Sequence, residues 1–277
     1  MKRTILNILA FAFVVAAFVS CDVIPENDRY IEVEEQQSER VQRLLIEEFT
    51  GHRCMNCPDG AAIVHEIQEY YPGRVMVIGI HAGMLALPLG QFASQNFMTP
   101  EGTAYNSAFA VQANPAALLN RAHFSGEDWA VRTKEKWMTY AIEELSKEPC
   151  CEVVPTVAYD AATRQLSVTT EIEAYDNMPA DLNLQVQLVE SHIIGKQLLA
   201  GNTIDEAYEH NHVFRHAVNG TWGESIQSLP AGEKKSYTCT ATLDEQWVAE
   251  NCHVVVFVYE NATKRVLQCN EAAVVAQ

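Results

Sequence analysis

The sequence predicts an α/β fold in its first half and an all-β antiparallel sandwich in its second half. Before residue 148, short apolar segments alternate with segments whose apolar residues recur every three to four positions, the period of an amphipathic helix. After residue 149 the period becomes two, which is typical of strands with one buried face. Strand–helix alternation indicates an α/β region, and strands joined by short turns indicate a sandwich.

Composition and charge limit the classes of function. The 277 residues are 48% hydrophobic and 20% charged, as in globular proteins, and the formal net charge is -17. An acidic surface repels phosphate groups, so we expect no nucleic-acid partner. Only the extreme N-terminus is continuously apolar, which excludes a protein with several membrane spans.

Residues 1–20 are predicted to be a lipoprotein signal peptide. Lys2 and Arg3 precede an apolar run over 5–19, and this run is too short to span a bilayer comfortably. The small residue followed by Cys21 resembles a bacterial lipobox, which implies cleavage before Cys21 and lipid attachment to its sulfur. The alternative is an ordinary secretory signal with an incidental cysteine. Residues 21–40 are acidic and poor in apolar side chains, so we expect a tether to the membrane-embedded lipid.

The predicted α/β region covers residues 41–148. The periodicity predicts strands over 41–49, 74–80 and 116–124. It predicts helices over 59–71, from Pro100 with Thr99 as its N-cap, and from Ser125 through Leu145 with Ser125 and Asp128 as its cap. The strand over 74–80 is nearly all apolar, as expected when both faces of a sheet are covered.

The predicted all-β region covers residues 149–277, and its architecture is expected to be an Ig-like antiparallel sandwich. Six strands are expected, over 153–160, 165–175, 183–191, 235–243, 252–260 and 264–275.

Apart from Cys21, the chain has seven cysteines, and an odd number leaves at least one thiol unpaired within the chain. The envelope is oxidising, so disulfides are permitted there. If residues 261–264 form a tight turn, Val256 faces Cys269, and Cys252 is then too far from Cys269 for a bridge. Cys239 is the better partner for either, and one of the adjacent Cys150 and Cys151 is a candidate for a bond to the sandwich.

Cys54-Met55-Asn56-Cys57 is the motif with the sharpest chemistry, since it lies between a predicted strand and a predicted helix. A helix N-terminus favours a thiolate, and so do Arg53 and, when protonated, His52. Cys54 could then attack a substrate disulfide and Cys57 could resolve the mixed disulfide. The alternatives are a structural or inert pair, or half of a zinc site. The second CxxC of a zinc site is absent, so we expect neither metal nor cofactor.

The segment LLIEEFTGHRCMNC resembles the strand, loop and redox pair of thioredoxin-fold proteins. Glu48 stands six residues before Cys54, where thioredoxins place a buried acid that assists proton transfer. Asn114-Pro115 resembles their cis-proline segment, which faces the redox pair. Arg53 replaces the tryptophan that usually precedes the first cysteine. The resemblance implies site roles for Cys54, Cys57, Glu48 and Pro115.

A more specific resemblance covers residues 41–277. The segments EEFTGHRCMNCPDG, VIGIHAG, NPAALLNR and YEHNHVFRHAVNGTWGE resemble an outer-membrane lipoprotein family of the Bacteroides and Porphyromonas group, named for a twenty-eight-kilodalton protein. The resemblance implies outer-membrane placement, on the surface or the periplasmic face, a thioredoxin-like domain, a C-terminal sandwich and a role as surface adhesin or receptor.

His210, His212 and His216 cluster in the last of these segments. A metal site is one interpretation, and a loop that packs aromatic residues on the sandwich is the other. Two functions therefore follow from the sequence. The first is a lipid-anchored surface binding or adhesin-type module, whose protein ligand is unknown. The alternative is an envelope thiol–disulfide oxidoreductase or redox sensor that uses Cys54 and Cys57.

Overall fold

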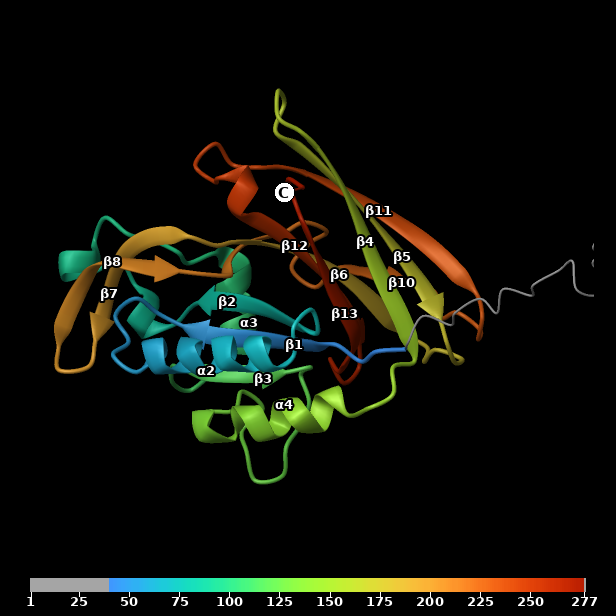
Figure 1. Ribbon diagram of the computed structural model, residues 1–277, viewed down its shortest axis with the longest axis horizontal. Helices are drawn as coiled ribbons and strands as arrows, with labels where there is room; N and C mark the ends of the chain where they lie inside the picture. Colours follow the sequence, from blue (N-terminus) through green and yellow to red (C-terminus); the bar gives the residue numbers. More distant parts are fainter. Residues whose placement is uncertain (1–39, 277) are drawn as a thin grey trace, which may run out of the picture. The chain divides into compact units, whose positions relative to one another are not determined.

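The computed structural model describes residues 40–276 (Figure 1). The predicted signal peptide, Cys21 and the tether before residue 40 lie outside the described residues. Residues from Arg40 onward form one compact unit. No helix in this part of the chain is long and apolar enough to cross a membrane.

All three α-helices of the described chain come before residue 148. The elements in order are β1 (Leu44–Thr50), α2 (Cys57–Tyr70), β2 (Val75–His81), η2 (Met84–Ala86), η3 (Gly90–Phe92), α3 (Pro100–Ala108), β3 (Ala116–Leu119), η4 (Lys134–Lys136) and α4 (Trp137–Leu145). The predicted cap of α3 is confirmed, because Thr99 Oγ1 accepts a hydrogen bond from Gly102 N at 2.9 Å. The strand predicted over 116–124 is real but ends at Leu119.

After residue 148 the described chain is built of strands and one short 3₁₀ turn. These elements are β4 (Cys151–Asp160), β5 (Gln165–Ala174), β6 (Leu182–Glu190), β7 (Ile193–Leu199), β8 (Thr203–His210), β9 (Val213–Ala217), β10 (Glu224–Ile226), β11 (Lys234–Thr242), η5 (Ala249–Asn251), β12 (Cys252–Glu260) and β13 (Val266–Ala273). The predicted order of a mixed helix–strand region followed by strands is therefore confirmed at this level. All six predicted strands are present, and β7 to β10 were not predicted.

One sheet runs through both halves of the chain, in the order β13-β12-β6-β9-β2-β1-β3, with β10 paired to β6. β1 pairs parallel to β2 and antiparallel to β3. The two halves meet where β2 pairs with β9, at Gly79 and Val213. A Cβ atom on Gly79 would lie 3.3 Å from the carbonyl oxygen of His212, so glycine permits this close approach. The expected boundary between 41–148 and 149–277 falls between α4 and β4 and stays a prediction.

A second sheet, in the order β11-β5-β4, packs face to face on part of the first (Figure 1). Its inward residues, such as Val168 and Ile172, share a buried core with Val186 on β6 and Val256 on β12. The alternating burial of β4 and β5 is the pattern of strands with one face in this core.

A buried ion pair stabilises the junction between the halves. Arg121, just after β3, donates two hydrogen bonds of 2.7 Å to the Glu47 carboxylate, and both side chains are fully buried. The guanidinium also lies over the rings of Phe257 and Tyr259 on β12. Such a pair is stable because each charge is matched and its geometry is bidentate.

The helix predicted from Ser125 is wrong over its first part, because α4 begins only at Trp137. Glu127 and Asp128 are engaged by later side chains instead of capping a helix. Glu127 accepts from Thr133 and Lys136, and Asp128 pairs with Arg132.

The expected bridges to Cys239 are absent in the described chain. The cysteines Cys150, Cys151, Cys239, Cys252 and Cys269 are all free thiols. Cys269 faces the core of the first region, where its sulfur lies 3.8 Å from that of Met76, whereas Cys239 packs against the core between the two sheets. A bulge after Val258 also shifts the register, so Phe257 and not Val256 is opposite Cys269.

Candidate functional site

Cys54 and Cys57 form a disulfide at the start of α2, with their Cα atoms 5.4 Å apart. Cys57 is the first residue of the helix, and Cys54 lies in the turn before it, where its N–H donates to Gly51 O at 3.0 Å. Both cysteines are only 2% exposed. Pro58 occupies the first turn of α2, where its missing N–H leaves no hydrogen bond unmade.

Glu48 lies on β1 with its carboxyl in the protein interior. Successive side chains of a strand point to opposite faces, so Glu47 points toward Arg121 and Glu48 points to the face that α2 covers. Glu48 Oε1 has no hydrogen-bond partner among the described residues. Burial raises the pKa of Glu48 from 4.5 to about 8, so the group is mostly protonated at neutral pH.

Pro115 packs on the same helix as the disulfide. The Asn114–Pro115 peptide bond is cis, as the sequence resemblance implies. A Cβ atom on Gly60 of α2 would lie 2.8 Å from Glu48 Oε1 and 3.0 Å from Pro115 Cβ. Glycine at this position therefore lets α2 pack against both residues. Asn114 Nδ2 donates to Thr50 O at 2.9 Å and to Ala82 O at 3.0 Å, which fixes the loop to the ends of β1 and β2.

A cavity of about 40 Å³ connects Glu48 with the disulfide. Its wall includes Glu48, Cys57, His81, Tyr208 and His210. A volume of this size can hold a water molecule in contact with several polar groups. Glu48 and Cys57 therefore line one cavity that has room for a single water molecule.

Two buried histidines, His81 and His210, line this cavity, and His52 stacks on His81, with 6.2 Å between the ring centroids; all three are uncharged at neutral pH. Burial lowers the pKa of His52, lowers that of His81 well below its usual value, and lowers that of His210 to about 4. His52 Nε2 lies 3.3 Å from Leu87 O, and its Nδ1 has no partner in the described chain. Because His52 is neutral, the expectation that it favours a thiolate when protonated does not apply near pH 7.

The β7–β8 hairpin covers the disulfide loop from the second half of the chain (Figure 1). Gln197 Nε2 donates to Cys54 O at 2.9 Å, and Leu198 N donates to His52 O at 2.8 Å. Gln197 is 3% exposed. The periodicity of the sequence did not predict this cover. Gly201 and Asn202, both with positive φ, form its turn and were the available signal.

The three histidines that cluster in the sequence of the second half lie in three different environments in the structure. His210 lies beside His81, His212 lines a different and larger pocket, and His216 Nδ1 lies 3.0 Å from Glu101 Oε1. Over residues 40–276 no group of three or more His, Cys, Asp or Glu side chains is arranged to hold a metal ion.

The sequence and fold were compared with known proteins. HBP35 of Porphyromonas gingivalis has a similar fold, with a TM-score of 0.67 and 15% identity over 84% of this chain and 75% of that one. A domain of the outer membrane lipoprotein Omp28 from Porphyromonas gingivalis is 25% identical over 47% of this chain and 91% of that one, with a TM-score of 0.34. No curated protein matches the chain significantly.

The family model described as outer membrane protein Omp28 matches residues 102–277. The match covers more than half of the chain, and it confirms the resemblance inferred from the four sequence segments. The members of this family are outer membrane proteins. The chain therefore belongs to the Omp28 family and is an outer membrane protein of the cell envelope.

Proposed function

We propose that this outer membrane protein is a lipoprotein, anchored through Cys21, that catalyses thiol–disulfide exchange with Cys54 and Cys57. The observation that supports this most strongly is the meeting of three groups at the start of α2. The disulfide, the partnerless Glu48 carboxyl and the cis Pro115 come from three separate segments, yet all contact one helix. The same grouping favours a thioredoxin-like fold for residues 41–148.

Exchange from the oxidised state begins with a substrate thiolate. It attacks the sulfur of Cys54, a substrate–Cys54 bond forms, and the Cys54–Cys57 bond breaks. The Cys57 thiolate takes the proton of Glu48, whose pKa of about 8 keeps that proton available at neutral pH. A second substrate thiol, losing its proton to the Glu48 carboxylate or to water, then displaces Cys54. The substrate leaves as a disulfide and the protein as a dithiol.

The reverse direction uses the same groups. The Cys54 thiolate attacks a substrate disulfide, and Glu48 accepts the proton of Cys57 as Cys57 resolves the mixed disulfide. Substrate would approach beside Pro115, because the backbone of Asn114 next to it can pair with an extended strand. The electron balance is closed in both directions, since one disulfide is exchanged for one dithiol.

A second function is a surface binding or adhesin-type module on the predicted Ig-like sandwich, with a structural disulfide. The observation that favours it is the enclosure of the disulfide. Both sulfur-bearing residues are 2% exposed, and Gln197 covers the loop that carries them. Exchange requires the β7–β8 hairpin to move aside, whereas a structural disulfide does not.

Trapping of mixed disulfides distinguishes the two functions. In Cys57→Ser the resolving thiol is missing, so Cys54 should accumulate adducts with envelope proteins on non-reducing gels. Cys54→Ser should accumulate none, and Cys239→Ser, which alters a half-buried free thiol, should behave as the wild type. If Cys57→Ser forms no adducts and the purified wild type catalyses no exchange, the redox proposal fails and the binding module stands alone.

A further inference from the structure

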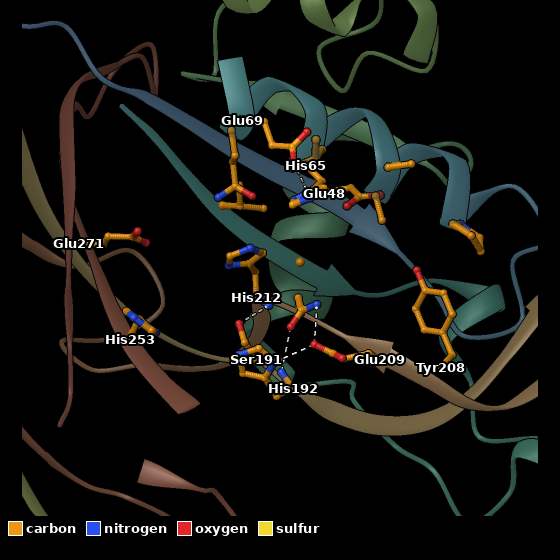
Figure 2. Close-up of a pocket in the computed structure, with 18 residues that line it drawn as sticks. Glu48, His65, Glu69, Ser191, His192, Tyr208, Glu209, His212, His253 and Glu271 are labelled. Atoms are coloured by element: carbon orange, nitrogen blue, oxygen red, sulfur yellow. Dashed lines mark hydrogen bonds and ion pairs between the residues drawn. The ribbon is translucent and has the colours of Figure 1, made fainter. Parts of the chain in front are cut away.

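A larger pocket of about 800 Å³ opens beside Glu48, on the face of the sheet next to α2 (Figure 2). Glu69 reaches it from α2, His212 from the β8–β9 connection, and Glu271 from β13. A volume of this size is typical of a site for a small organic molecule.

Sheet register explains why residues so distant in sequence meet here. Glu48 on β1 is level with Gly79 on β2, and Gly79 is level with Val213, the residue after His212. Val213 is in turn level with Glu190 on β6, which pairs with Cys252 at the start of β12. The pocket therefore extends along one row of paired residues across five strands. Helix α2 covers only part of the sheet face there.

The lining of the pocket combines carboxyl groups with histidines. Its carboxyl groups are those of Glu48, Glu69, Glu209 and Glu271, and neither Lys nor Arg is among the described residues that line it. The apolar remainder includes Val64 and the ring of Tyr208. Glu69 lies 3.4 Å from His65 and Glu209 lies 2.7 Å from His192, so Glu48 and Glu271 are the carboxyl groups of this lining without an ion-pair partner in the described chain. The formal net charge of -17 disfavours an anion here.

Several polar groups of the pocket lack protein partners. Glu48 is 5% exposed and its Oε1 makes no hydrogen bond in the described chain. Within residues 40–276, the half-buried side chains of Glu271, His212 and His253 also make no hydrogen bond or ion pair. Burial lowers the pKa of His212 to about 4, so its ring adds no positive charge at neutral pH. Polar groups left unpaired in a sheltered site are costly, and a ligand that donates hydrogen bonds would satisfy them.

We propose that this pocket binds a small organic cation, with an ammonium or guanidinium group at the carboxyls and an apolar stem along α2 and Tyr208. The stem fits the apolar lining, and the ring of Tyr208 can contact the cation. A bare metal ion fits less well, since no three potential ligands of the described chain converge. The same chemistry is offered by a free polyamine and by a Lys or Arg side chain of a peptide.

The site predicts a linkage between binding and pH. A cation beside Glu48 favours its carboxylate, so binding near pH 7 should release a proton. Affinity should therefore rise with pH, by up to about fiftyfold between pH 6 and pH 8 if binding requires the carboxylate. The titratable groups that share a pocket or cavity wall with Glu48 are His65 and Glu69 on α2, His81 on β2, His192 after β6, Tyr208, Glu209 and His210 on β8, His212, His253 on β12 and Glu271 on β13.

Calorimetry on the mature chain tests the proposal with putrescine, spermidine and trilysine as probes, and butanediol as the neutral match to putrescine. Titrations in two buffers of different ionisation enthalpy report the proton release. Amine binding without diol binding is the expected result. Glu48→Gln should abolish the proton release and the dependence on pH, and Glu271→Gln should weaken binding at least about tenfold. Glu245→Gln, on an exposed loop, should match the wild type.

The outcome does not depend on redox activity, because the Cys54→Ser/Cys57→Ser double variant should bind equally well. Tighter binding of spermidine than trilysine identifies a free amine as the source, and the reverse order identifies a peptide. The proposal is overturned if no amine binds at millimolar concentration to the folded protein, or if butanediol binds as well as putrescine. Unchanged binding in both glutamate variants, or binding of Zn²⁺ alone, overturns it too.

Discussion

Replacing Glu48 with glutamine should change how the stability of this protein depends on pH. The native Glu48 carboxyl has a pKa of about 8, against an ordinary value of 4.5, and the cause is burial alone. The folded state therefore holds a proton between these two values that the unfolded state has lost. The contribution of Glu48 to the free energy of unfolding is therefore fully present at low pH, and it is lost as pH rises through the folded pKa. Glutamine has nearly the same size and no ionisation, so this loss disappears.

The magnitude follows from the two pKa values. Glu48 should lower the free energy of unfolding by about 3–4 kcal/mol between pH 5 and pH 8. The buried histidines act with the opposite sign, because their pKa values are lowered and their effect is complete near pH 6.5. Their contribution is the same in both proteins and cancels in the difference.

Urea unfolding of the oxidised wild type and Glu48→Gln at several pH values provides the measurement. Between pH 5 and pH 8, the free energy of unfolding of Glu48→Gln should rise by a few kcal/mol relative to that of the wild type. The exposed Glu245→Gln should show no such rise. If the free energies of unfolding of Glu48→Gln and wild type change in parallel with pH, Glu48 is already ionised in the folded protein over this pH range. The proton donor of the proposed exchange would then be lost.

Three further outcomes are expected. Cys21→Ser should abolish labelling with palmitate, and labelling that persists would contradict the lipoprotein assignment. Arg121→Met should cost about 3–5 kcal/mol in urea unfolding, because it leaves the Glu47 carboxylate buried without its partner. Gln197→Ala removes the side-chain hydrogen bond from the hairpin to Cys54 O, so phosphine should reduce the disulfide up to about tenfold faster, and an unchanged rate would exclude this bond as a barrier.

Local signals predicted the elements whose hydrogen bonds are local. Thr99 caps α3 by accepting a hydrogen bond from the backbone N–H of Gly102, three residues later, so the local sequence was enough to predict it. Ser125 and Asp128 offered the same pattern but failed. Asp128 pairs with Arg132 and Glu127 with Lys136, and the chain forms α4 only from Trp137 onward. Val131 instead forms an antiparallel β-bridge with Ala117, a contact between distant positions that a local cap signal does not reveal.

The cover over the disulfide could not be predicted from periodicity, because it depends on contacts far apart in sequence. Gln197 reaches Cys54 across 143 positions, and the sheet continues from β2 to β9 through the pair of Gly79 and Val213. The turn at Gly201 and Asn202 indicates that a hairpin exists, but nothing local indicates where it packs. The CxxC has a local pattern, and the roles of Glu48 and Pro115 came from the resemblance to thioredoxin-fold proteins, whereas the enclosure of the disulfide has no local pattern.

The adjacent Glu47 and Glu48 show why a buried acid here indicates function. Strand alternation sends the two carboxyls to opposite faces of β1. Glu47 meets a bidentate Arg121, whereas Glu48 meets the glycine of α2, the cavity at Cys57 and the larger pocket. A buried carboxyl kept without a cation costs stability, and a leucine there would cost less. The opposite signs expected for Glu47→Gln and Glu48→Gln at pH 8, destabilising and stabilising, would separate the residue that holds the fold from the one retained for proton transfer or ligand binding.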